Sequence, residues 1–466
     1  MIFPILSAIL GILAFLPFDY FWPFGFFYLV PLFIFFAKEN KFWRLIWGTL
    51  IFRTILCLGT VYYTLEPIVW TQSIGIFIGL PISIFIIKRG LKNQLSTVKC
   101  QMSIVALLPF LWTFFDHLQA RFSLLPTYII TAGNIFGSSP FLGLSSFGGL
   151  IFLTFFAAII NALIVAAYKN LASINRSKIF LAIIAIIFLG WGISKIQINK
   201  NASDYNLLPE TIKIASVSTN KNFYYSDLEK IKDKIINSEI DFLILPEDIF
   251  NNAPTELDIK FWRDFAQKIN VNLLVTGDHR ENNKRYNSSV LIDKNNEIID
   301  IHNKNRLTFI GEYWPFGKWV PPHINWLKKT QPEIKNYAVF NFKNAYSAGN
   351  QKLLTAKLKS KELKLASLIC LEIHYLRDLK NYKKMGAQLF VNPTSNRWLD
   401  LGLYHFLYLT NNLRKIESVW LKTPIILSGV KDYAGIITPD GKIQSVNFEN
   451  KNNAKNYEIF IGEIKI

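Results

Sequence analysis

The strongest constraint on how this chain folds is an abrupt change in composition near residue 200. Residues 1–195 are dominated by Phe, Ile and Leu, whereas residues 200–466 are rich in Lys, Asn, Asp and Glu. A helix needs about 20 apolar residues to cross a bilayer. Seven stretches reach or approach that length: 1–17, 20–37, 45–64, 68–87, 100–117, 147–168 and 179–195. The composition therefore predicts a helical membrane region followed by a polar domain.

A polar segment near 196–208 separates the two regions and is typical of a linker. We therefore expect a membrane domain of about seven transmembrane helices at 1–199 and a second domain at 208–466. The first apolar stretch lacks a positively charged start and a small-residue cleavage site, and it runs directly into the next stretch. These features favour a membrane helix over a cleaved signal peptide.

Basic residues accumulate in alternate loops between the apolar stretches. Three of these loops carry ten of them: Lys38, Lys41, Arg44, Lys88, Arg89, Lys92, Lys99, Lys169, Arg176 and Lys178. The loops on the opposite side hold only Arg121. Because basic loops stay on the cytoplasmic side, the pattern predicts a cytoplasmic N-terminus. Seven crossings would then place residues 208–466 on the outer side of the membrane.

The net charge of +18 does not by itself indicate nucleic-acid binding. The basic residues are dispersed, and no basic stripe with interleaved aromatic residues is evident in the sequence. We therefore expect no nucleic-acid partner. We also expect no metal or organic cofactor, because the histidines are scattered. They are His117, His279, His302, His323, His374 and His405.

Two features of the apolar region have both a structural and a functional interpretation. Arg53 lies inside the third apolar stretch, where an ionisable residue is a functional candidate or pairs inside the helix bundle. The long segment 118–146 is rich in Gly, Ser, Pro and aromatic residues. It is either an interfacial segment over a lipid-facing cavity or an ordinary connecting loop.

Short apolar runs alternate with helical patterns in the polar half. We expect helices at 226–236 and 258–268, and strands at 212–217, 241–246, 271–276, 288–292, 297–302, 365–369, 387–391, 425–428, 433–438 and 442–448. Such alternation, with added hairpins, predicts an α/β domain built from two layered sheets.

Three titratable residues stand at strand ends in this half: Glu247, Lys304 and Cys370. A cysteine thiol can attack a carbonyl when a carboxylate takes its proton and a lysine stabilises the oxyanion that forms. The trio therefore predicts acyl or amide transfer through a thioester. We also expect the neighbouring lysine and carboxylate to lower the pKa of the thiol below its free value of about 8.5.

Each member of the trio also has a purely structural interpretation. A free cysteine is often a buried core residue. Glu247 is compatible with a helix start, and Lys304 with an exposed surface position. A cysteine–histidine protease arrangement with His374 is a rival catalytic interpretation. With only Cys57 and Cys100 besides Cys370, no disulfide framework is indicated.

The order glutamate, lysine, cysteine resembles the nitrilase/amidase superfamily. Its place behind a multi-helix membrane region is similar to one branch of that superfamily, the apolipoprotein N-acyltransferase family. Matching segments occur along nearly the whole chain: Leu16–Asp19, Leu245–Glu247 (like Trp-Pro-Glu), Lys304–Glu312 (like Lys-x-His-Leu-Val-Pro-Phe-Gly-Glu), Ile369–Glu372 (like Ile-Cys-Tyr-Glu), Asn392–Trp398 (like Ser-Asn-Asp-x-Trp) and Arg414–Glu417 (like Arg-x-x-Glu).

The resemblance implies a fold, a mechanism and roles for residues. The fold is a multi-helix membrane domain followed by a nitrilase-like α-β-β-α sandwich. Cys370 is the nucleophile that becomes acylated, Glu247 the general base and Lys304 the electrophilic stabiliser. Glu312, Glu372, Tyr313 and Trp398 are supporting or substrate-binding residues.

The same resemblance implies the reaction and its location. An acyl chain passes from a membrane phospholipid to Cys370, and then to the N-terminal amine of a diacylglyceryl-cysteine apolipoprotein. The protein is integral to the bacterial inner membrane, with its catalytic domain in the periplasm. A membrane-tethered amidase or nitrilase, which transfers the acyl group to water, is the alternative. A catalytically inactive scaffold or transport-like protein is a third possibility.

The chain departs from the family pattern at several positions around this site. Arg397 stands where the family has aspartate, and Trp398 comes one position early. Leu371 replaces an aromatic residue after the cysteine, and Arg306 replaces a histidine. No apolar span follows the last strand of the polar half, whereas family members typically end in one more membrane helix.

Overall fold

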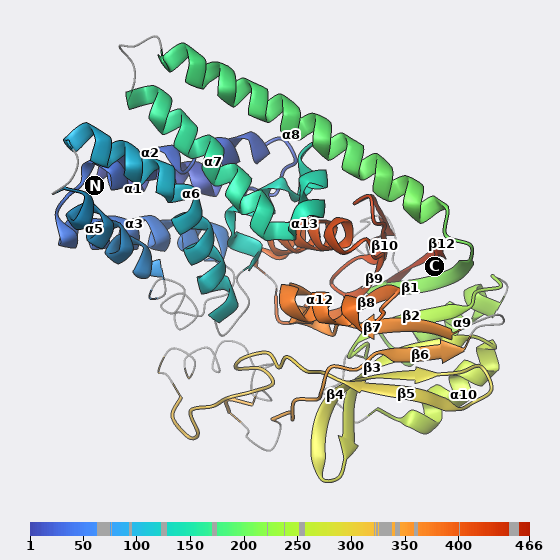
Figure 1. Cartoon of the computed structure of the whole chain (residues 1–466). Coiled ribbons are helices and arrows are strands. Elements are labelled where there is room, and N and C mark those ends of the chain that lie inside the picture. Colours follow the sequence, from blue (N-terminus) through green and yellow to red (C-terminus); the bar gives the residue numbers. More distant parts are fainter. Residues whose placement is uncertain are drawn as a thin grey trace. The chain divides into compact units, whose positions relative to one another are not determined.

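The structure is a computed structural model of the whole chain (Figure 1). It describes all residues except 63–74, 76, 93–95, 123–127, 170–174, 221, 237, 251–256, 321, 323–324, 326–337, 341–344, 358–361, 400 and 447–455. The described residues form two compact units. Unit 1 contains Met1–Asn201 and Tyr404–Trp420, and unit 2 contains Ala202–Leu403 and Leu421–Ile466.

Unit 1 is helical, because its residues are predominantly apolar and a helix satisfies every backbone hydrogen bond within itself. Its helices in the N-terminal region are α1 (Ile2–Ala14), η1 (Trp22–Phe26), α2 (Val30–Lys38), α3 (Phe42–Thr60), α5 (Gly79–Lys92), α6 (Thr97–Phe122), η3 (Tyr128–Ile130), η4 (Ala132–Ser138), η5 (Leu142–Phe147), α7 (Gly149–Lys169) and α8 (Asn175–Asn206). The segment predicted as a long loop therefore consists partly of short 3₁₀ helices.

Four of the described helices are long and apolar enough to cross a bilayer: Phe42–Thr60, Val98–Phe122, Gly149–Tyr168 and Ser177–Asn206. The first two predicted spans are shorter, and the second is divided into η1 and α2. Much of the predicted span at 68–87 lies outside the described residues. Seven crossings therefore remain a prediction, while an N-terminal region with several apolar helices is confirmed.

The predicted linker at 196–208 is wrong for most of its length. Helix α8 continues through it to Asn206. Polar side chains do not end a helix, and the sequence has no proline or glycine between Gly192 and Pro209 to break this one. The helix thus extends from the apolar region into the polar one without a break.

Helix α13 (Leu403–Leu421) belongs largely to unit 1, although it lies late in the chain. The side chain of Asn134 donates to the carbonyl of Leu409 at 3.0 Å. Gly137 approaches the α13 backbone so closely that an added Cβ would lie 2.6 Å from the Cα of Asn412. His405 lies 2.8 Å from the carbonyl oxygen of Phe15. The C-terminal half of the chain therefore contributes one helix to the apolar unit.

Arg53 is buried within unit 1, with 1% of its surface exposed. Its guanidinium lies 5.0 Å from the centre of the Phe77 ring. The interior position agrees with the interpretation in which this arginine faces the helix bundle.

Unit 2 is built on one hydrogen-bonded sheet of twelve strands in the order β5-β4-β3-β2-β1-β9-β8-β7-β6, with β12 beside β1 and β10 and β11 beyond β9. The strands are β1 (Thr211–Thr219), β2 (Phe242–Glu247), β3 (Asn272–Glu281), β4 (Lys284–Ile292), β5 (Ile298–Asn303), β6 (Leu354–Lys357), β7 (Glu362–Ser367), β8 (Leu389–Ser395), β9 (Ile425–Val430), β10 (Ala434–Ile437), β11 (Ile443–Val446) and β12 (Tyr457–Lys465).

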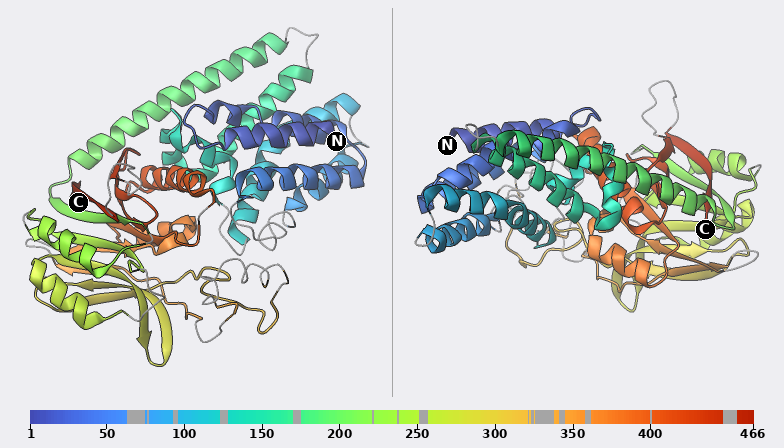
Figure 2. Two further views of the ribbon diagram at one scale, coloured as in Figure 1. Left: turned by 180° about the vertical axis from the view of Figure 1, so that it is seen from behind. Right: turned by 45° about the horizontal axis from the view of Figure 1, so that its top comes forward.

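The sheet folds over so that its two halves enclose an apolar core. That core contains Ile214 and Ile244 from one half together with Leu365, Val391 and Ile426 from the other. A second core lies between β1–β4 and the helices α9 (Tyr225–Ile236) and α10 (Ile259–Ile269). Helix α12 (Leu376–Lys384) lies on the opposite side of the strands (Figures 1 and 2). The layers are those of the predicted α-β-β-α sandwich.

All the strands and helices predicted for the polar half are present, with small shifts at their ends. The predicted hairpins at 288–302 and 433–448 pair antiparallel where they are described. The sequence interpretation missed β6, β12 and α12. It also treated the strands as two separate sheets, whereas β1 and β9 join them through pairing at Ser218 and Thr219.

Candidate active site

The strand directions of unit 2 bring the three predicted catalytic residues to one edge of the sheet. Strands β2, β1, β9, β8 and β7 are successively parallel, and β5 shares their direction because two antiparallel pairings separate it from β3. Glu247 ends β2, Lys304 follows β5, and Cys370 follows β7. In open α/β sheets, ligands bind at the carboxyl ends of parallel strands. The topology therefore makes this edge the candidate site.

Lys304 lies between two buried carboxylates. Its Nζ is 2.9 Å from both oxygens of Glu312 and 3.6 Å from Oε1 of Glu247. Asn287 on β4 donates to Oε1 of both carboxylates at 2.7 Å. Oε2 of Glu312 also accepts the backbone N–H of Thr308 at 2.7 Å. Lys304, Glu247 and Asn287 are more than nine-tenths buried, and the side chain of Glu312 is 12% exposed. The cluster holds the ammonium in one position and leaves Oε2 of Glu247 without a hydrogen bond among the described residues.

The surroundings of the cluster shift the pKa values of its two carboxylates in opposite directions. Burial raises the pKa of Glu247 to about 7, against the opposing effect of Lys304. Burial alone would also raise the pKa of Glu312, but Lys304 and three hydrogen bonds outweigh it and lower that pKa. Burial acts against the charged form of Lys304, yet Glu312 and Glu247 raise its pKa well above its usual value. Glu247 is therefore the carboxyl group able to exchange a proton near neutral pH.

Cys370 occupies a strained turn directly after Ile369. Its φ is +53°, a left-handed conformation that non-glycine residues rarely adopt. Asn392 on β8 donates from Nδ2 to the carbonyl oxygens of Leu368 at 2.5 Å and Cys370 at 3.1 Å. The backbone N–H of Ser395 donates to the sulfur. Strain of this kind is held at functional sites by surrounding contacts, and here it presents the thiol toward the charged cluster.

The expected lowering of the thiol pKa is not observed. Burial raises the pKa of Cys370, and the negative charges of Glu247 and Glu312 add to that effect, which Lys304 only partly offsets. Two carboxylates face one ammonium, so the local charge disfavours a resting thiolate. Cys370 is therefore protonated at rest, and its reaction as a nucleophile requires a base.

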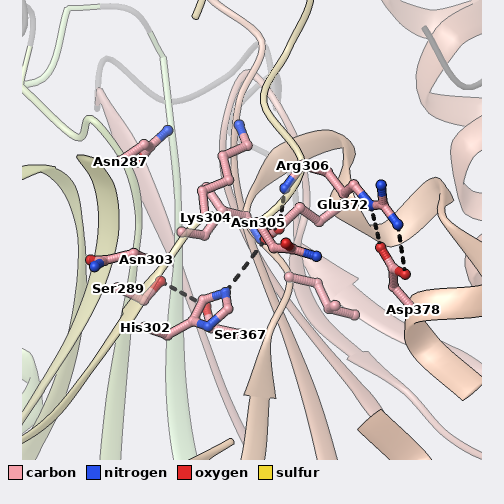
Figure 3. A network of polar contacts seen from close by, with 12 residues as sticks. Asn287, Ser289, His302, Asn303, Lys304, Asn305, Arg306, Ser367, Glu372 and Asp378 are labelled. Atoms are coloured by element: carbon pink, nitrogen blue, oxygen red, sulfur yellow. Dashed lines mark hydrogen bonds and ion pairs between the residues drawn. The ribbon is translucent and has the colours of Figure 1, made fainter. Parts of the chain in front are cut away.

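Glu372 lies behind the thiol rather than beside it. Its carboxylate is buried and accepts the backbone N–H group of Asn305 at 2.7 Å (Figure 3). It also accepts the backbone N–H group of Ile369 at 2.9 Å. It therefore holds the backbone of the turn that carries Cys370 through hydrogen bonds, and a supporting role in the reaction remains a prediction.

Tyr313 and Trp398 are at the periphery. Tyr313 is 45% exposed and Trp398 is 38% exposed. The backbone carbonyl of Tyr313 accepts from Ile310 at 2.9 Å. Both side chains are therefore partly open to solvent, and a substrate-binding role for them remains a prediction.

Arg397, which departs from the family pattern, binds the backbone of the segment after Glu247. Its guanidinium donates to the carbonyl oxygens of Ile249 at 2.8 Å and Phe250 at 2.5 Å. These residues directly follow Glu247 and the positive-φ residue Asp248. Arg397 thus secures the segment that carries the predicted base.

The sequence interpretation missed Asn287 and Asn392, the two amides that order the cluster and the turn. Asn392 directly follows the apolar residues Leu389–Val391 of β8, and that interruption was an available signal, whereas Asn287 lies among polar residues of β4. The structure also places no group of three or more His, Cys, Asp or Glu side chains close enough to hold a metal within the described part of the chain.

Comparison with protein families defines the class of the two regions. Residues 204–417 match the carbon-nitrogen hydrolase model, and residues 7–163 match the apolipoprotein N-acyltransferase N-terminal domain. Unit 2, with its layered sheet and its Glu-Lys-Cys edge, thus has the nitrilase-like fold. Saccharomyces cerevisiae Nit3 of the nitrilase superfamily aligns with a TM-score of 0.38 and 17% identity over 55% of this chain and 91% of its own. A Nesterenkonia AN1 amidase aligns with a TM-score of 0.39 and 14% identity, over 56% and 93%.

Curated relatives match both regions together. The apolipoprotein N-acyltransferase of Pasteurella multocida is 23% identical over 94% of this chain and 85% of its own length. The enzyme of the same name from Haemophilus influenzae is 22% identical over the same shares. With both domain models in the same order, the chain belongs to the apolipoprotein N-acyltransferase family, whose members are multi-pass membrane acyltransferases.

Proposed function

We propose that this protein transfers an acyl chain from a membrane phospholipid to the N-terminal amine of a diacylglyceryl-cysteine lipoprotein, with Cys370 as the acyl carrier. One observation carries the proposal: a thiol held on a strained turn faces a buried cluster of one ammonium and two carboxylates. The names of the curated relatives support the acceptor, since they are apolipoprotein N-acyltransferases, and the phospholipid donor is part of the proposal.

The first half-reaction forms a thioester. Glu247 takes the proton of the Cys370 thiol while the sulfur attacks the ester carbonyl of the phospholipid. A sulfur–carbon bond forms, the ester carbon–oxygen bond breaks, and the departing alkoxide recovers the proton as the lysophospholipid leaves. Lys304, oriented by Glu312 at 2.9 Å, stabilises the oxyanion that develops on the carbonyl.

The pKa values favour this division of labour. A base is most effective when its pKa lies near the working pH, and that of Glu247 is about 7. Glu312, whose pKa is lowered, stays ionised and keeps Lys304 charged and in place.

In the second half-reaction, Cys370 is the leaving group. The free amine of the lipoprotein attacks the thioester, the carbon–sulfur bond breaks, and Glu247 carries the amine proton to the departing thiolate. An amide is released and the thiol is restored. Both substrates are lipids anchored in a bilayer, which suits a catalytic unit joined to apolar helices. The family resemblance supports the bacterial inner membrane as the location. The alternation of basic loops supports a cytoplasmic N-terminus and a catalytic unit on the periplasmic side.

The decisive experiment is mass spectrometry of the purified full-length protein after incubation with phosphatidylethanolamine in detergent. We expect an acyl adduct on the peptide that contains Cys370, and its loss in Cys370→Ser. Cys100→Ser is the matched control and should keep the adduct, because Cys100 lies on a helix of unit 1. If the active protein forms no adduct but hydrolyses small amides, the amidase alternative is favoured instead.

A further inference from the structure

A fully buried histidine lies next to the candidate site, and the mechanism above does not use it. His302 is the penultimate residue of β5, two positions before Lys304, and none of its surface is exposed. Neither ring nitrogen has a hydrogen bond among the described residues. A buried imidazole without a hydrogen bond is costly, so its surroundings bear on its role.

Its nearest charged neighbour is Glu372. Nε2 of His302 lies 3.7 Å from Oε2 of that carboxylate, and the two side chains face each other beneath the Lys304 segment (Figure 3). The other groups around the ring are already engaged or lack charge. Ser289, opposite His302 on β4, hydrogen-bonds to Ser367. Tyr382 from α12 packs its ring edge to face against the imidazole.

Asp378, the other carboxylate in this network, is held by a different cation. Arg306 donates to it from Nε at 2.5 Å and from a terminal nitrogen at 3.0 Å. This leaves Glu372 as the carboxylate that His302 faces, with Nε2 of the imidazole 3.7 Å from Oε2, which is longer than a hydrogen bond.

Glu372 connects two segments that must be in register for the reaction. Its Oε1 accepts the backbone N–H groups of Asn305 at 2.7 Å and Arg306 at 3.0 Å, directly after Lys304. Its Oε2 accepts the N–H of Ile369 at 2.9 Å, directly before Cys370. One carboxylate therefore joins the segment of the ammonium to the turn of the thiol. A shift of this carboxylate would therefore act on both segments.

We propose that His302 is a positioning residue for Cys370, acting through Glu372. The imidazole compensates the buried carboxylate on the oxygen that holds Ile369, and so keeps the turn in the conformation that presents the thiol to Lys304. The proposal rests on the proposed function of Cys370 as the acyl carrier. In this role His302 does not contact the substrate.

The test compares His302→Phe, His302→Gln and Glu372→Gln in the full-length protein. At saturating phosphatidylethanolamine, we expect His302→Phe to form the Cys370 adduct about 10- to 100-fold more slowly, since a displacement of about 1 Å can cost that much. The phospholipid concentration at half-maximal rate should not change, because His302 is buried away from substrate. His302→Gln keeps an N–H donor and should lie nearer to wild type.

The double variant decides whether the histidine acts through the glutamate. His302→Phe combined with Glu372→Gln should be no slower than Glu372→Gln alone, because the two residues act as a unit. Tyr382→Phe is the matched control: it keeps the ring that packs on His302 and should acylate at the wild-type rate. A wild-type rate in His302→Phe, or losses that multiply in the double variant, would overturn the proposal.

A second readout separates this inference from the proposed function. The rate at which iodoacetamide labels Cys370, measured on its peptide, should fall in His302→Phe relative to wild type whether or not a lipid is transferred. If wild-type protein takes no acyl chain, the proposed function fails, yet the labelling ratio still tests His302. An unchanged ratio would contradict the positioning role even if acylation occurs.

Discussion

Replacing Lys304 by methionine would remove the ammonium that lies between Glu247 and Glu312, while keeping most of the buried side-chain volume. In wild type, two carboxylates and one ammonium share a site that is almost completely excluded from water. In Lys304→Met, the same two carboxylates remain with Asn287 as a shared donor. Removing one partner of a buried ion pair costs about 3–5 kcal/mol, because the remaining charge is uncompensated.

That cost predicts a measurable change in thermal stability. For a unit of roughly 250 residues, each kcal/mol corresponds to about 2–4 °C in Tm, so Lys304→Met should lower the Tm of unit 2 by about 6–20 °C. The assay is thermal unfolding of the detergent-solubilised protein at pH 7. Adding Glu312→Gln returns the net charge of the cluster to its wild-type value and should recover most of the lost Tm. It should not recover acylation, which needs the ammonium.

The pH dependence of the Tm tests whether burial raises the pKa of Glu247. The pKa of Glu247 is raised from 4.5 to about 7, so its protonated form is the one the fold favours. The stability it contributes is present below about pH 4.5 and is lost as the pH rises through 7. Because Lys304 lowers this pKa, Lys304→Met should raise it further and make the loss of Tm greater at pH 8 than at pH 6. A Tm that is unchanged by Lys304→Met, or that Glu312→Gln fails to restore, would refute the reasoning.

Three further predictions follow from the same structure. The rate of Cys370 acylation should fall as the pH drops below about 7, because the base Glu247 must be deprotonated, and pre-steady-state mass spectrometry measures this limb. Asn287→Ala should shift the limb to higher pH and cost about 1.5–3 kcal/mol, since it removes hydrogen bonds to charged groups. Gly137→Ala should cost about 1–3 kcal/mol and lower the Tm of unit 1, because its Cβ would meet the backbone of Asn412.

Each of these predictions has a matched control. Gly192→Ala on α8, where nothing lies within 4 Å of the added Cβ, should leave the Tm unchanged or raise it slightly. For the pH limb, Glu247→Gln should abolish acylation at every pH rather than shift its dependence. An unshifted limb in Asn287→Ala would separate the amide from the pKa of Glu247, and equal Tm values for the two glycine variants would contradict the close approach at Gly137.

Local sequence patterns predicted the elements of unit 2 well because the spacing of apolar residues in most strands and helices follows which of their faces are buried. The run Phe242–Pro246 is apolar because both faces of β2 are covered, and the helix 258–268 begins at Asp258, whose side chain caps it. Strand β6 was missed because it is only four residues long, and β12 was missed although its run of Ile and aromatic residues is typical of a strand. The polar end of α8 was misread because polar composition was taken as a sign of a linker.

The site was predicted in part, for the same reason. Glu247, Lys304 and Cys370 stand at strand ends, and parallel strands bring such ends together. The amides of Asn287 and Asn392 act on partners 22 to 40 residues away, and no local pattern identifies those partners. The thiol pKa was expected to fall, but burial is a property of the folded chain, and it exceeds the effect of Lys304.

The sequence by itself determined that this chain has an apolar helical region and an α/β domain with a thiol, a lysine and a glutamate at its strand ends, because those properties follow from local composition and periodicity. Only the tertiary structure decided that Glu312 and Asn287 orient the lysine, that Glu372 joins the thiol turn to the lysine segment, and that α13 packs within the apolar unit. Hydrogen bonds and charge compensation between distant segments exist only after the chain has folded, and local sequence carries no record of their geometry.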